Sequence, residues 1–226
     1  MDTLIGLEPV DRKSTASIIA DRLREAIMRG TLEPGTQLGE TDLARQLGVS
    51  RGPLREAMQR LVQEGLLRSE RHRGLFVIEL DEAGIRDVYR TRRVVERAAG
   101  ELILSRDVDQ VAARLAEVHD EMRQAAEAGD RDALVEADLD FHEAFVEESG
   151  SIRLVRMSRT LLVETRMCLS AMADTYEFPH EVAEEHGAIV DAIRARDQDR
   201  LFRLLDDHMD DALNRLTTAY AELVED

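Results

Sequence analysis

The chain has 226 residues, of which 43% are hydrophobic and 34% charged, and this length suits two domains that each bury a core of their own. No run of 18 apolar residues occurs, and the opening MDTLIGLEPV has no basic region leading into an apolar run. Neither a membrane span nor a secretory signal is therefore supported. We expect a globular protein of the cytoplasm with one buried structural cysteine, Cys168.

The net charge of −17 is distributed unevenly along the chain. Residues 1–80 hold 12 of the 30 Lys and Arg and 12 of the 47 Asp and Glu, so residues 81–226 hold the remaining 18 and 35. Within residues 41–75 there are seven arginines and four acids, which makes this segment locally basic. The first domain is neutral overall and has a basic patch, whereas the second domain is acidic. The basic patch can therefore bind the phosphate backbone of DNA although the net charge of the whole chain is negative.

The first domain, expected over residues 1–80, has the pattern of a helix-turn-helix. Apolar residues recur at helical spacing over 14–29 and again over 41–47. Gly48 breaks this short second helix, and a longer third helix begins after Ser50, which suits the N-cap position. Two helices joined by a tight turn that contains glycine make up a helix-turn-helix.

A basic wing is expected after this motif, with short strands at 66–69 and 75–78 joined by a turn over 70–74. A recognition helix in the major groove offers donors at its N-terminal end, where Arg51 and Arg55 lie one turn apart. Helix-turn-helix patterns also occur in domains that bind no nucleic acid, in which exposed arginines form only a solvated face. The candidate DNA-contacting residues are Ser50, Arg51 and Arg55 on the helix and Arg73 and Gly74 in the wing.

The first domain resembles the winged-helix domain of the GntR family of transcriptional regulators. The resemblance includes LEPG at 32–35, LGVSR at 47–51 and EGL at 64–66. It implies that the five candidate residues occupy DNA-contacting positions. Gly52 stands where many members have Thr, and Thr41 stands where some have Arg, so the operator sequence is not transferable from other members.

The second domain, expected over residues 81–226, has an acidic helical pattern with hardly any strand signal. The expected fold is therefore mainly α: an N-terminal winged helix-turn-helix domain and a C-terminal all-α bundle of six or seven helices. The six helices that the pattern itself indicates lie at about 82–104, 107–128, 131–148, 151–173, 179–196 and 198–224.

Four residues of the second domain form a candidate metal site. Asp138 and His142 are four positions apart, which places a carboxylate and an imidazole on one helix face. His186 and His208 lie on the last two expected helices, and packing in a bundle can bring them to the same point. Three imidazoles and one carboxylate suit a divalent transition metal. By spacing alone, the dispersed histidines are also compatible with positions that never meet.

The second domain resembles the FadR-type ligand-binding domain, or FCD domain, of one large GntR branch. The resemblance implies that Asp138, His142, His186 and His208 hold a metal such as Zn²⁺, Ni²⁺ or Mn²⁺, and that a carboxylate ligand binds beside it. An expected count of six helices is closer to the VanR-like variant than to the seven-helix FadR type. The matching landmarks are Tyr89, Arg92, Glu96, residues 138–142, 185–186, 188–189 and 207–208.

A metal with open positions beside an arginine makes a receptor for a small organic acid, because the guanidinium binds the carboxylate that the metal does not. Arg92 and Arg166 are the candidate effector-binding residues. For both, an ion pair with one of the many nearby acids is the alternative.

We therefore expect a ligand-responsive transcriptional regulator rather than an enzyme. The family resemblance implies that it is a repressor. The expected form is a homodimer whose two winged helices read half-sites of an approximate palindrome in double-stranded DNA. The metal donors could physically support hydrolysis or oxidation, but no general base or nucleophile pairs with them. A metal-dependent enzyme and a DNA-binding protein with a purely structural metal are the alternatives.

Overall fold

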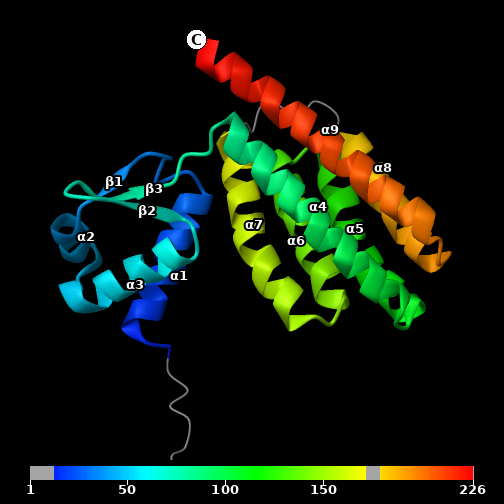
Figure 1. Cartoon of the computed structure of the whole chain (residues 1–226), viewed down its shortest axis with the longest axis horizontal. Helices are drawn as coiled ribbons and strands as arrows, with labels where there is room; N and C mark the ends of the chain where they lie inside the picture. The colour runs from blue at the N-terminus through cyan, green and yellow to red at the C-terminus, as the bar shows by residue number, and fades with distance from the viewer. Residues whose placement is uncertain (1–12, 172–178, 226) are drawn as a thin grey trace, which may run out of the picture. The chain divides into compact units, whose positions relative to one another are not determined.

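The computed structural model describes residues 13–171 and 179–225. The chain forms two compact units: the first holds the residues up to Ile78 apart from Met28–Gly30, and the main part of the second begins at Glu79. Figure 1 shows the first unit in blue to cyan, with helices and a small sheet, and the second in green to red, with helices alone.

Three helices form the body of the first unit: α1 Thr15–Met28, α2 Glu40–Leu47 and α3 Arg51–Gln63. α2 ends at Gly48, whose φ of 65° lies in the left-handed region that favours glycine. Leu54, Met58 and Leu61 recur along the inner face of α3 and are fully buried. The predicted helix-turn-helix is therefore confirmed, with the turn at the expected glycine.

The wing is a three-stranded antiparallel sheet, whereas the sequence predicted two strands. Its strands are β1 Gln37–Leu38, β2 Leu67–Glu70 and β3 Gly74–Val77, in the order β1-β3-β2. Gln37 pairs with Phe76, and Leu38 pairs with Leu75. Two residues are too few to show a polar and apolar alternation, so β1 is defined only by the edge of β3 that it pairs with.

Six helices form the second unit within the part of the chain that the structure describes, as the helical pattern predicted. Asp81, Asp107 and Asp130 are the N-caps of the first three, and each carboxylate accepts a backbone N–H from the first turn. Such a cap stabilises a helix by about 1 kcal/mol. The helices are α4 Glu82–Leu104, α5 Val108–Ala128, α6 Arg131–Glu148, α7 Ile152–Ala171, α8 Pro179–Arg194 and α9 Gln198–Glu225.

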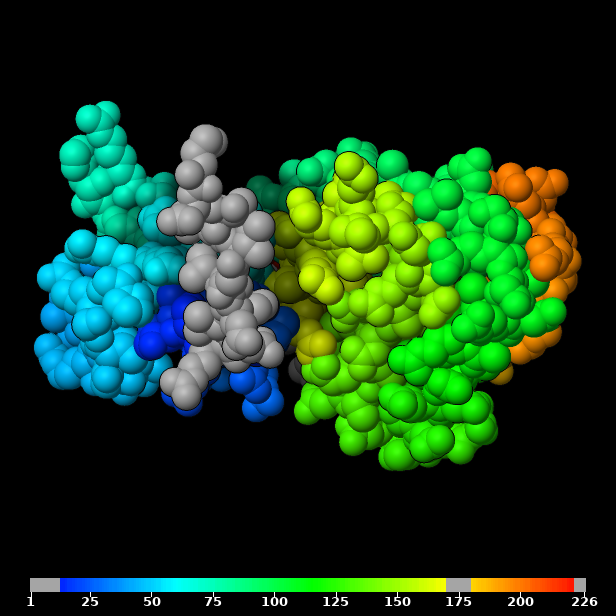
Figure 2. Space-filling model, turned by 90° about the horizontal axis from the view of Figure 1, so that it is seen from below, coloured from blue at the N-terminus to red at the C-terminus, as the bar shows by residue number. Residues whose placement is uncertain are grey.

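The helices pack with α5 against α6 and α8, and with α4 against α7 and α9 (Figure 1). In the space-filling view, side chains of α5, α6 and α7 form a continuous green to yellow surface on one side of this unit (Figure 2). No helix in the described ranges is both long and apolar enough to cross a membrane.

Two apolar clusters fill the helical unit, and a layer of buried polar side chains lies between them. Phe141 belongs to the larger cluster, and Leu139, two residues earlier on α6, belongs to the smaller. Along α4, Tyr89 packs in the smaller cluster and Val95 in the larger, while Arg92 between them is buried but polar. A buried charged side chain needs a hydrogen-bonding or oppositely charged partner. This polar layer is therefore a candidate binding site.

Candidate functional site

The N-terminal end of α3 presents the residues predicted to contact DNA. The side chains of Arg51 and Arg55 are each 58% exposed. Ser50 occupies the N-cap position, but within the described chain its hydroxyl makes no capping hydrogen bond. The predicted N-cap position is therefore confirmed, although, among the described residues, the serine side chain leaves the helix end uncapped. The hydroxyl and the first N–H groups of α3 are open to a phosphate oxygen.

Glu40, which the sequence reasoning did not single out, holds the two arginines together. Its Oε2 accepts a hydrogen bond from Arg51 Nη2 at 3.2 Å and from Arg55 Nε at 2.7 Å. Burial raises the pKa of Glu40, but the hydrogen bonds from Arg55 and Arg51 outweigh this and lower it. One carboxylate from α2 thus keeps both guanidinium groups on the same side of α3.

The tip of the wing presents a further arginine. Arg73 is 68% exposed, pairs with Glu70, and lies 5.0 Å from the centre of the Phe76 ring. Gly74 has a φ of 106°, which strongly favours glycine. The ion pair and the ring contact give Arg73 a defined position beside the close backbone turn at Gly74.

The four predicted metal-binding residues come together in the buried polar layer of the helical unit. One donor atom from each of Asp138, His142, His186 and His208 lies within 4.8 Å of the others. His142 Nε2 is 3.1 Å from His208 Nε2 and 3.4 Å from His186 Nε2. Asp138 Oδ1 is 3.3 Å from His186 Nε2. The alternative that these histidines never meet is wrong, because α6, α8 and α9 pack so that they do.

Each of the three imidazoles is oriented by an acceptor at its Nδ1 atom. An acceptor there favours the tautomer with the proton on Nδ1, which leaves the Nε2 lone pair unprotonated. Three such lone pairs and one carboxylate converge, and a cation would stabilise this arrangement, so the donor set fits a divalent transition metal. The acceptors are Glu96 Oε2 for His142 and Glu185 Oε2 for His208, both at 2.8 Å, and the Val182 carbonyl for His186 at 2.7 Å.

The electrostatics favour the protonation state that a metal needs, with neutral imidazoles and an ionised carboxylate. Burial lowers the pKa of His142, and burial together with the neighbouring His208 lowers the pKa of His186 well below its ordinary value. Burial raises the pKa of Asp138, but the three histidines outweigh this effect and lower it.

Arg92, a predicted effector-binding residue, is buried beside this cluster rather than lying on the surface. Its Nε and Nη2 donate to Glu96 Oε1 at 3.1 and 2.9 Å, and its Nη1 donates to Thr165 Oγ1 at 3.4 Å. Burial raises the pKa of Glu96, but His142 and Arg92 outweigh it and lower the pKa to about 2. Arg92, Glu96 and His142 therefore form a continuous chain that ends at a candidate metal ligand.

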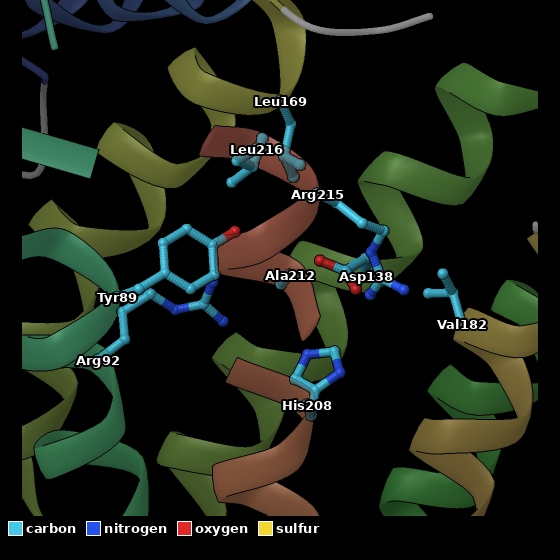
Figure 3. A pocket seen from close by; sticks show the side chains of 9 residues that line it. All are labelled: Tyr89, Arg92, Asp138, Leu169, Val182, His208, Ala212, Arg215 and Leu216. Atoms are coloured by element: carbon cyan, nitrogen blue, oxygen red, sulfur yellow. The ribbon is translucent and has the colours of Figure 1, made fainter. Parts of the chain in front are cut away.

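A pocket borders the metal cluster (Figure 3). Its polar lining comes from Tyr89 and Arg92 of α4, Asp138 of α6, and His208 and Arg215 of α9. Its apolar lining comes from Leu169, Val182, Ala212 and Leu216. The pocket therefore offers a ligand two of the four candidate metal donors and two guanidinium groups.

Arg166, the second predicted effector residue, is not among the residues that line this pocket. Its guanidinium forms an ion pair with Glu136, and only 16% of its side chain is exposed. Arg215, which the sequence reasoning missed, lines the pocket instead. It follows His208 by seven residues, which is two helical turns, and this spacing could have identified it.

Comparisons with known proteins match the two units separately. Residues 15–77 match the model for bacterial regulatory proteins of the gntR family. Residues 87–211 match the model for the FCD domain. The two predicted resemblances are therefore confirmed.

Whole-chain relatives are transcriptional regulators. The gluconate operon transcriptional repressor of Bacillus licheniformis is 30% identical over 212 residues, which cover 92% of this chain and 87% of that protein. The repressor of the same name from Bacillus subtilis strain 168 is 27% identical over 220 residues, covering 95% and 90%. The crystal structure of a GntR transcriptional regulator from Rhodococcus sp. RHA1 superposes with a TM-score of 0.78 and 30% identity, covering 91% and 99%.

These relatives are regulators and not enzymes, which rejects the metal-dependent enzyme as an alternative. The chain belongs to the GntR family of bacterial regulatory proteins, and its helical unit is an FCD domain.

Proposed function

We propose that the protein is a metal-dependent transcriptional repressor of the cytoplasm whose operator binding is modulated by a small carboxylate. The observation that carries this proposal is that four buried metal donors converge beside a pocket lined by two of them and by arginine. The names of two relatives, both gluconate operon transcriptional repressors, support repression and an acid effector.

Asp138, His142, His186 and His208 would hold a divalent metal such as Zn²⁺, Ni²⁺ or Mn²⁺. When bound, the metal supplies a Lewis acid that accepts a carboxylate oxygen. Arg92, which lines the pocket, orients His142 through Glu96 and donates from its Nη1 to the hydroxyl of Thr165. Of the two predicted effector-binding arginines, Arg92 lines the pocket, whereas Arg166 is paired with Glu136 and is not among the lining residues.

Ser50, Arg51, Arg55, Arg73 and Gly74 are the proposed DNA-contacting residues. Two copies of the chain would associate as a homodimer and place two recognition helices on half-sites of an approximately palindromic operator. Because coupling between two ligands is reciprocal, an effector that weakens operator binding must itself bind more weakly to the DNA-bound protein.

Metal content tests the first half of this proposal. Inductively coupled plasma mass spectrometry on the purified wild type should find about one metal per chain, lost in His142→Ala and in His208→Ala. His180→Ala is the matched control, because His180 is exposed and is not part of the cluster. A folded wild type that holds no metal after equilibration with Zn²⁺, Ni²⁺ or Mn²⁺ would contradict the proposed metal centre.

Operator binding tests the second half. A duplex selected from random DNA by the protein would be titrated by fluorescence anisotropy, with and without gluconate, citrate and other small carboxylates. At least one acid should change the apparent Kd, and Arg51→Ala should reduce discrimination between the selected and an unrelated duplex. If the operator affinity is the same without acid and with every acid that binds, the result would favour a purely structural metal.

A further inference from the structure

Two arginine–glutamate–histidine chains border the pocket, and each ends at a candidate metal ligand. The first joins Arg92 to His142 through a shared glutamate. In the second, Glu185 Oε2 lies 2.8 Å from His208 Nδ1, and Glu185 Oε1 lies 3.7 Å from Arg215 Nη1. Both arginines line the pocket, so they are the two side-chain cations that an anionic ligand would meet there.

The two guanidinium groups differ in how many of their N–H groups donate hydrogen bonds within the protein. Arg92 is nearly fully buried, and its three nitrogens donate to Glu96 and Thr165. Among the residues that the structure describes, Arg215 has one ion contact, at 3.7 Å, which is longer than a hydrogen bond. The N–H groups of Arg215 are therefore available to a ligand, whereas those of Arg92 are largely occupied.

The position of Arg215 sets a second anion-binding point beside the metal cluster. Arg215 lies two turns after His208 on α9, and helical side chains lean toward the N-terminus of their helix, which directs Arg215 back toward the cluster. Ala212 lies between them on the same face, and Leu216 lies beside Arg215 in the pocket lining (Figure 3). The pocket thus has two anion-binding points with apolar lining alongside.

We propose that Arg215 selects the effector, and that the effector is a compact dicarboxylate. One carboxylate would bind at the metal centre and the other at the guanidinium of Arg215. This inference rests on the proposed function, because the first carboxylate needs the metal centre. A guanidinium binds a carboxylate through two parallel charge-assisted hydrogen bonds, which a methyl group cannot form and a hydroxyl forms only in part. The apolar lining suits the methylene groups that join the two carboxylates.

Isothermal titration calorimetry on the full chain loaded with Zn²⁺ tests the assignment. The probes are malonate with propionate, succinate with butyrate, and glutarate with pentanoate, since each pair differs by one carboxylate in place of a methyl group. At least one diacid should bind about tenfold or more tightly than its partner, the size of one charge-assisted hydrogen bond. 4-Hydroxybutyrate should bind more weakly than succinate if the four-carbon pair shows this preference.

Arg215→Gln should abolish the preference for the diacid while leaving the affinity of the monoacid and the zinc content unchanged. Arg203→Gln is the matched control: it removes the same charge from an exposed position of α9 that does not line the pocket, and it should keep the preference. Calorimetry and metal analysis on the same preparations separate ligand selection from metal retention.

The outcomes separate this inference from the proposed function. Wild type that holds no metal after equilibration with Zn²⁺, Ni²⁺ or Mn²⁺ would reject the metal centre, and with it both proposals. Zinc-loaded protein that binds monoacids as tightly as diacids, or that binds none of the probes, would overturn the role of Arg215 alone. The role of Arg215 is also overturned if Arg215→Gln keeps the preference for the diacid or loses zinc. It is likewise overturned if succinate binds more tightly than butyrate but 4-hydroxybutyrate binds as tightly as succinate.

Discussion

Replacing Arg92 by methionine tests how much the buried ion pair contributes to the stability of the FCD domain. The side chains of Arg92 and Glu96 are only 3% and 2% exposed, so Arg92→Met leaves the Glu96 carboxylate buried, with the His142 imidazole as a hydrogen-bond partner but without its counter-charge. Removing one partner of a buried ion pair costs about 3–5 kcal/mol. In a domain of roughly 150 residues, that loss lowers Tm by roughly 10 °C.

The assay is thermal and urea unfolding of metal-free protein, because bound metal would stabilise the variants unequally. Arg86→Met is the matched control: Arg86 lies on the same helix and also pairs with a glutamate four residues away, but it is 41% exposed and should cost less than about 1 kcal/mol. Arg92→Met combined with Glu96→Leu removes both charges and should recover most of the loss. If Arg92→Met costs no more than Arg86→Met, the inference from burial to stability is refuted.

Three further changes probe other parts of the structure. Ser50→Ala should leave the free energy of unfolding within about 0.5 kcal/mol of wild type, because no side-chain cap is lost, yet weaken operator binding in anisotropy titrations; marked destabilisation would contradict the open hydroxyl. Gly48→Ala should destabilise the winged helix by about 1 kcal/mol or more in urea unfolding, because φ is +65° there. Gly52→Ala, at a helical position with free space, should not. Glu185→Gln should weaken metal binding about 10- to 100-fold in chelator competition, and an unchanged affinity would show that Glu185 does not orient His208.

Much of the DNA-binding domain was predictable because its signals are local. The apolar period of α3 and the break at Gly48 depend on residues within a few positions of one another, so the turn was located correctly. β1 was missed because its two residues become a strand only by pairing with β3. Residue type correctly predicted Ser50 as the N-cap, but only side-chain geometry decides whether the capping hydrogen bond forms.

For the FCD domain, the sequence alone determined which donors are present and that Asp138 and His142 share a helix face. Only the tertiary structure decided that these donors meet. His186 and His208 are 44 and 66 residues from His142, and no local pattern relates their positions until α6, α8 and α9 pack together. The tertiary structure also decided which arginine remains available to a ligand. That depends on burial and on acids contributed by other turns and helices, so Arg92 is paired, Arg166 lies outside the pocket lining, and Arg215 is left open.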